Sequence, residues 1–123
     1  MRDEVPVPSI DARTAEARLR AGEEPAPILL DVREPHEFVA GRAVGATHAP
    51  LSTLGPRIAE LPRDRPMFVI CHSGERSAMV TGYLLANGWT DVVNVSGGMI
   101  AWEFHGLPTR RGAPEPTELD LPG

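Results

Sequence analysis

One cysteine, Cys71, lies where an expected strand meets an expected helix, and it is the only cysteine in the chain. The apolar run 67–70 is typical of a buried strand, and residues 77–86 are typical of a helix. A loop between such elements turns several backbone N–H groups toward one point, where the helix dipole adds positive potential. These groups would stabilise a thiolate, with Arg76 as a further source of positive charge. We therefore interpret residues 71–76 as an anion-binding loop around a cysteine nucleophile.

The length of this loop indicates what it holds. Four residues separate Cys71 from Arg76. A loop of this size suits a single sulfur atom, whereas a loop longer by one residue would leave room for a tetrahedral phosphate. Gly74, in the middle, permits backbone angles that turn N–H groups inward. We infer that the transferred group is small.

The elements around the loop alternate between strands and helices. Short apolar runs predict strands at 28–30, 67–70 and 92–95, with briefer strands within 5–10 and at 46–48. Helices are expected at 12–21, 35–40, 77–86 and 99–104, and from residue 52 or 53 to 61. This alternation predicts an α/β fold with a parallel sheet of about five short strands and helices on both faces. In such sheets the site lies at the carboxyl ends of the strands, where Asp31, Cys71 and Ser96 would converge.

Composition limits the other classes of function. The net charge of −5 argues against a general nucleic-acid binder, which needs a basic face. No apolar run is long enough to span a membrane, and we expect no signal peptide at the N-terminus. A lone cysteine excludes an internal disulfide framework and favours a reducing compartment, so we expect a cytoplasmic protein. The four histidines have no metal-ligand spacing, and no metal or other cofactor is expected.

We expect one folded domain over residues 1–107, because a chain of 123 residues can bury a sizeable core without cross-links. From residue 108 to 123, proline, glycine and charged residues dominate, and we predict a poorly ordered, acidic tail. A monomer is the default expectation.

Three stretches together resemble the rhodanese-like domain family. The run 71–77, Cys-His-Ser-Gly-Glu-Arg-Ser, has the form of the family's six-residue loop followed by serine. The run 31–35, Asp-Val-Arg-Glu-Pro, is similar to its aspartate-valine-arginine turn, and 97–102 to its Gly-Gly-x-x-Ala-Trp segment. The resemblance covers roughly residues 7–107, with one departure at 41–46. There Gly-Arg-Ala-Val-Gly-Ala replaces the Gly-His-Ile-Pro-Gly-Ala of many members.

The resemblance implies a sulfurtransferase. Its cysteine takes the outer sulfur of a donor such as thiosulfate, forms a persulfide, and passes the sulfur to a thiol or cyanide. By this likeness Cys71 is the sulfur carrier, and Asp31 and Arg33 support the loop. The residues that would hold the persulfide and donor are His72, Ser73, Gly74, Glu75, Arg76 and Ser77. The implied partners are a small-molecule sulfur donor and a thiol acceptor, with a protein sulfur acceptor as an alternative.

Several alternatives stay open at this point. Arg76 contacts the donor or forms an ion pair with Asp31 or Glu75. Arg33 is expected to form a solvated pair with Glu37. For the whole protein, one alternative is a non-enzymatic sulfur carrier or regulatory binding module. Another is a cysteine phosphatase or arsenate reductase, which resembles this fold but has a longer loop.

Overall fold

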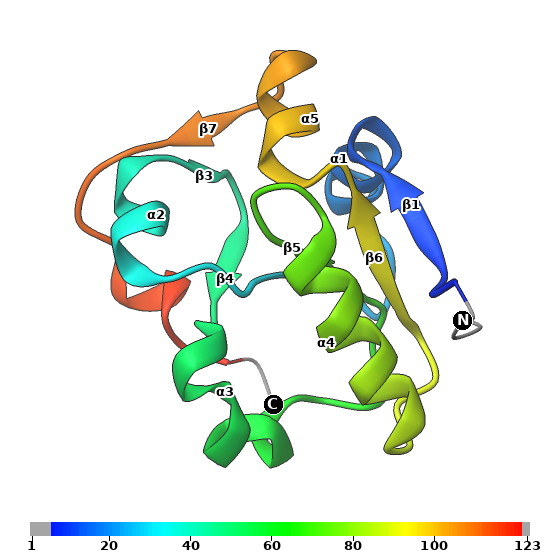
Figure 1. Ribbon diagram of the computed structural model, residues 1–123. Coiled ribbons are helices and arrows are strands. Elements are labelled where there is room, and N and C mark those ends of the chain that lie inside the picture. The colour runs from blue at the N-terminus through cyan, green and yellow to red at the C-terminus, as the bar shows by residue number, and fades with distance from the viewer. Residues whose placement is uncertain (1–5, 122–123) are drawn as a thin grey trace, which may run out of the picture.

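The computed structural model describes residues 6–121, which form a sheet of five parallel strands with helices around it (Figure 1). The strand order is β1-β6-β5-β2-β4, with bounds Ser9–Asp11, Val92–Ser96, Met67–Ile70, Ile28–Asp31 and Ala46–His48 in that order. The α-helices are α1 (Ala12–Arg20), α2 (Pro35–Ala40), α3 (Leu51–Arg57), α4 (Glu75–Ala86) and α5 (Gly98–Phe104). The α/β fold class expected from the sequence is therefore confirmed.

Helices cover both faces of the sheet because successive side chains of a strand point to opposite sides. In β2, Ile28 and Leu30 join the core that includes Leu84 of α4, whereas Leu29 joins the core that includes Trp102 of α5. In Figure 1, α4 lies in front of the sheet and α1 lies behind it. The loop between β5 and α4 is thus fixed by elements that are buried on both sides.

Most helix boundaries follow from local chemistry. Asp11 is the N-cap of α1, and its carboxylate accepts a hydrogen bond from the Thr14 N–H at 2.7 Å. Helix α4 begins at Glu75, two residues before its expected start, because Gly74 adopts a left-handed conformation at φ 103° and ends the loop there. The helix expected up to residue 61 is α3 followed by a short 3-10 turn, η1 (Ile58–Glu60). Residue 5, in the expected first strand, lies outside the described residues.

The prediction of a poorly ordered segment after residue 107 is wrong for residues 108–121. A short strand, β7 (Thr109–Arg110), pairs with β3 (Arg42–Ala43), and a 3-10 turn, η2 (Pro116–Glu118), follows it. Figure 1 shows β7 crossing beside β3 and the chain then passing α2. The physical reason is a buried ion pair between segments far apart in sequence, in which Glu118 accepts from Arg42 Nε at 2.6 Å and Nη2 at 2.9 Å.

In residues 6–121, no helix is both long and apolar enough to cross a membrane. Within the same residues, no group of three or more His, Cys, Asp or Glu side chains is placed to hold a metal ion.

Candidate active site

The Cys71 sulfur lies directly after β5, and three hydrogen-bond donors of the following loop and helix converge on it. The N–H of Gly74 lies 3.1 Å from Sγ, and the N–H of Ser77 lies 3.3 Å from it. The Ser77 hydroxyl donates to the same atom at 3.2 Å. A neutral thiol is a weak acceptor, so three donors aimed at one sulfur favour the thiolate.

The loop directs its N–H groups inward because other parts of the chain bind its carbonyls. The Cys71 carbonyl accepts from the Met99 N–H at 2.8 Å, and the His72 carbonyl accepts from the Ile100 N–H at 3.1 Å. Both donors lie in the first turn of α5, where N–H groups lack partners within the helix. Gly98 permits this contact, because a Cβ there would lie 2.4 Å from the Cys71 carbonyl oxygen. The Gly-Gly pair of the sequence therefore allows close approach to the Cys71 loop as well as a tight turn.

Asn94, which sequence reasoning did not single out, holds a third carbonyl of the loop. Its Nδ2 donates to the carbonyl of Gly74 at 3.2 Å. Gly74 is also the residue whose N–H donates to the sulfur. Its Oδ1 is buried without a hydrogen-bond partner in the described part of the chain. An unsatisfied buried acceptor costs about 1–3 kcal/mol of folding free energy, so stability alone does not explain an amide side chain at this position. Within residues 6–121, the one hydrogen bond of its side chain is with the loop.

The Cys71 side chain is fully covered, with an exposed fraction of 0%. Burial by itself raises the pKa of the thiol. The Ser77 hydroxyl and the N–H groups of Ser77, Gly74 and Ser73 outweigh that effect and bring the pKa of Cys71 below its ordinary value. The sulfur thus meets the hydrogen-bonding requirement for a nucleophile, although it lies beneath the surface.

Asp31 and Arg33 bind each other, and not the Cys71 loop. Arg33 Nη2 donates to the Asp31 carboxylate at 2.9 Å, and both side chains are buried. Arg33 also donates to the carbonyls of Glu37 and Gly41, which attaches the turn after β2 to the end of α2. The expectation of a solvated pair between the Arg33 and Glu37 side chains is therefore wrong. Ser96, expected to converge with Asp31 and Cys71, is exposed and donates to the Ile10 carbonyl at 3.3 Å.

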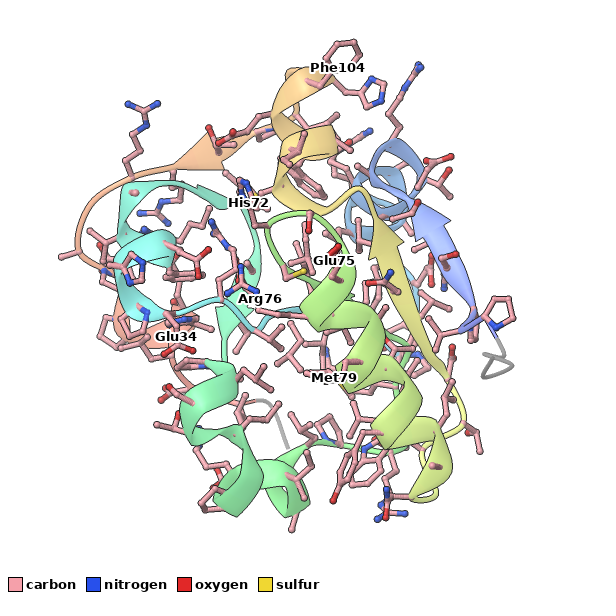
Figure 2. The ribbon with its side chains drawn as sticks, in the orientation of Figure 1. Glu34, His72, Glu75, Arg76, Met79 and Phe104 are labelled. Carbon is pink, nitrogen blue, oxygen red and sulfur yellow. The ribbon has the colours of Figure 1, made fainter. Side chains whose placement is uncertain are left out.

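Arg76 forms an ion pair with a residue that sequence reasoning did not name for it. Its Nη1 and Nη2 donate to the two carboxylate oxygens of Glu37 at 2.8 and 2.9 Å. The expected alternatives for a structural pair, Asp31 and Glu75, are wrong. Figure 2 shows Arg76 on the side of the loop that faces α2. The two residues are 39 positions apart, and no local pattern in the sequence could have paired them.

The other side chains of the loop differ in exposure. His72, Ser73 and Glu75 are exposed, whereas Gly74 and Ser77 are buried. His72 lies beside a cavity of about 290 Å³ that also borders Glu37 of α2 and Glu103 of α5. The candidate site therefore has a covered sulfur, an outer layer of exposed loop side chains, and a cavity at its edge.

The pKa of Cys71 can be measured from the pH dependence of its alkylation. Because the loop donors stabilise the thiolate, the midpoint of the iodoacetamide rate against pH is expected below the ~8.5 of a free cysteine. Asn94→Ala releases the Gly74 carbonyl and should raise that midpoint by about 0.5–1 unit, as a weakened hydrogen bond to a charged group would. Asn87→Ala is the matched control, since Asn87 Nδ2 donates to the Tyr83 carbonyl on α4, away from the loop. Equal midpoints for the two variants would contradict a positioning role for Asn94.

Comparison with known proteins agrees with this fold. The family model described as the rhodanese-like domain matches residues 8–105. A protein named sulfurtransferase from Allochromatium vinosum is 37% identical over 102 residues, which cover 83% of this chain and 94% of that protein. By these matches the chain belongs to the rhodanese-like domain family.

Solved structures give the same result. A rhodanese-related protein from Thermoplasma volcanium superposes with a TM-score of 0.72 at 34% identity, over 84% of this chain and 97% of that one. A thiosulfate sulfurtransferase from Pseudomonas aeruginosa superposes with a TM-score of 0.76 at 30% identity, over 87% of this chain and 21% of that chain. The fold is thus that of rhodanese-like proteins.

Proposed function

We propose that this protein is a sulfurtransferase that carries a sulfane sulfur on Cys71. The observation on which the proposal depends is the convergence of the Gly74 N–H, the Ser77 N–H and the Ser77 hydroxyl on Sγ. The same donors that stabilise a thiolate can stabilise a persulfide anion at that place. Membership in the rhodanese-like family and the name of the Allochromatium relative support the proposal.

The reaction has two displacements. First, the Cys71 thiolate attacks the outer sulfur of the donor. The donor's bond to that sulfur breaks, and its electron pair leaves with the rest of the donor, as sulfite when the donor is thiosulfate. Second, an acceptor thiolate or cyanide attacks the outer sulfur of Cys71–S–S⁻, and the S–S bond breaks to restore the Cys71 thiolate. Atoms and charge balance in each step without a metal or redox cofactor.

The loop residues have distinct roles in this proposal. Gly74 and Ser77 bind the reacting sulfur, and the Ser73 N–H adds to the positive potential at that sulfur. His72, Ser73 and Glu75 form the outer layer that a donor meets, because their side chains are exposed. Since Cys71 is fully covered, we expect these side chains to move when a donor enters. Asp31 and Arg33 support the loop indirectly, by fixing the turn between β2 and α2.

The proposal is tested by loading the protein with sulfur and measuring its intact mass. Incubation with thiosulfate or glutathione persulfide is expected to add one sulfur atom, and cyanide or dithiothreitol should remove it. Cys71→Ser should show no such gain, because the chain has no other cysteine. Circular dichroism of both proteins serves as the folding control. The absence of an adduct across several donors would overturn the proposal.

The full burial of Cys71 also favours a second candidate, a sulfur carrier that loads once and waits for a partner. Steady-state turnover distinguishes the two functions. Repeated turnover with a small thiol acceptor supports the enzyme. Stoichiometric loading of Cys71 followed by turnover too slow for metabolism supports the carrier. A phosphatase receives no support, because Arg76 is engaged by Glu37 and only four residues separate Cys71 from Arg76.

A further inference from the structure

The Arg76 guanidinium is held by a carboxylate that is itself fixed in place. Glu37 accepts both of its terminal N–H groups, at 2.8 and 2.9 Å. Glu37 Oε1 also accepts from the Glu34 N–H at 3.0 Å, as part of the capping box that begins α2. Arg76 lowers the pKa of Glu37 to about 2, so the carboxylate stays charged at neutral pH. The pair is therefore a preorganised, electrically neutral unit beside the Cys71 loop.

The remaining charges near the loop do not make it cationic. Glu75, in the loop, is exposed, and Glu103 lines the cavity beside His72. Arg33 borders the same cavity, but its charge is already matched by the buried Asp31 carboxylate. Once the Arg76–Glu37 and Arg33–Asp31 pairs are set aside, the charged side chains named on this side are two carboxylates, Glu75 and Glu103. A small dianion therefore meets no unpaired guanidinium among the residues that line this cavity.

We infer that Glu37 is a specificity-determining residue that keeps Arg76 from binding an anionic donor, so that Cys71 takes its sulfur from the persulfide of a thiol rather than from an inorganic dianion such as thiosulfate. This inference rests on the proposed function and names its donor class. In the step, the Cys71 thiolate attacks the outer sulfur of R–S–SH, the S–S bond breaks, and R–S⁻ leaves with the electron pair. The product is Cys71–S–SH, and no other reactant is needed.

Glu37→Gln separates the charge of Glu37 from its shape. Glutamine also serves at this position of a capping box, so α2 keeps its first turn. The amide oxygen still accepts one hydrogen bond from Arg76, but the guanidinium charge is no longer neutralised. Single-turnover loading of Cys71, followed by intact mass, gives a rate for thiosulfate and a rate for glutathione persulfide. We expect the variant to load from thiosulfate about fivefold to tenfold faster, as a newly available charge on a partly exposed arginine would allow. The rate with glutathione persulfide should change by less than about twofold.

Two further variants show whether the gain comes from Arg76. Glu103→Gln removes the same charge from the same cavity, and within residues 6–121 no hydrogen bond joins Glu103 to Arg76. It should therefore shift the ratio of the two rates much less than Glu37→Gln does, because it releases no guanidinium. Adding Arg76→Gln to Glu37→Gln should abolish the gain with thiosulfate. A general loosening of the site would instead raise both rates, or persist in the double variant.

A measurement on the wild-type protein keeps the inference testable if the variant does not fold. A cationic binding site for a dianion weakens steeply with salt. Because Arg76 is neutralised, loading from thiosulfate should change by less than about twofold between low salt and ~0.5 M salt. A strong fall in that rate would overturn the inference. So would an unchanged donor ratio in Glu37→Gln with normal loading, which would leave the proposed function intact. Failure of every donor to load wild-type Cys71 would overturn both.

Discussion

Gly98→Ala is expected to disable the Cys71 loop and to destabilise the whole fold. A Cβ at this position would lie 2.4 Å from the Cys71 carbonyl oxygen and 2.6 Å from that of His72, and both atoms belong to backbone that has little freedom to move. Gly98 also adopts a φ of 54°, which disfavours alanine. Overpacking costs about 1–3 kcal/mol and the left-handed conformation about 1–2 kcal/mol, so the loss is about 2–5 kcal/mol.

The effect on function should exceed the effect of lost stability. To make room for the methyl group, the Cys71 and His72 carbonyls must move away from α5, and they then lose the Met99 and Ile100 N–H groups. The loop N–H groups would no longer be aimed at Sγ. We therefore expect the rate of sulfur loading by the folded variant to fall at least about tenfold, equivalent to ~1.4 kcal/mol of activation free energy.

Gly106→Ala is the matched control for this prediction. Gly106 has a similar φ of 65°, but a Cβ there would meet no atom within 4 Å. It should therefore lose only the conformational part, about 1–2 kcal/mol, and keep the wild-type loading rate. Urea unfolding measures the stability of both variants, and intact mass measures loading. Equal loading by the two variants would show that the contact between α5 and the loop does not position the sulfur site.

Glu118→Ala is expected to cost about 3–5 kcal/mol of stability, because it leaves the buried Arg42 charge without its counterion. The Arg42 side chain is 1% exposed, and after the substitution its acceptors within residues 6–121 are the carbonyls of Phe38 and Gly112. Glu60→Ala is the control, since Glu60 pairs with Arg57 at the surface, where such pairs contribute about 0.2–1 kcal/mol. The midpoint of urea unfolding should fall far more for Glu118→Ala than for Glu60→Ala. Similar midpoints would mean that the ion pair does not secure the C-terminal segment.

The same pair gives a direction for the dependence of stability on pH. The hydrogen bonds from Arg42 lower the pKa of Glu118 below its ordinary value. A carboxyl group with a lowered pKa in the folded state contributes its full stabilisation above its unfolded pKa, about 4.3. The contribution is lost as pH falls from there through the lowered folded pKa. Acid should therefore destabilise the wild type more than Glu118→Ala, and the difference between them in urea should shrink over that range.

Local chemistry explains which features the sequence could predict. The Asp11 cap, the proline at the start of α2 and the helix that follows the loop all depend on residues within four positions of one another. The four-residue spacing between Cys71 and Arg76 likewise involves only neighbouring residues, and it indicated a loop around a sulfur atom. The short apolar runs indicated buried parallel strands, because both faces of such strands are covered.

Most of the errors and omissions involve partners that are distant in sequence, although Arg33 pairs with Asp31 only two positions away. The Glu37 and Arg76 side chains, 39 positions apart, meet only because β2 and β5 are neighbours in the sheet. Arg42 and Glu118, 76 positions apart, meet where the chain folds back so that β7 pairs with β3. The composition of the C-terminal segment predicted disorder, but one buried carboxylate with its arginine gives that segment a fixed place.

The sequence by itself therefore determined the α/β architecture, the strand-loop-helix around Cys71 and the kinship with rhodanese-like domains, because periodicity, caps and spacing act over a few residues. Only the tertiary structure decided that α5 and Asn94 bind the loop carbonyls, that Glu37 neutralises Arg76, and that the sulfur lies beneath the surface. Those features depend on which side chains the packed sheet brings together, and a charge or a carbonyl has no preferred distant partner until the chain has folded.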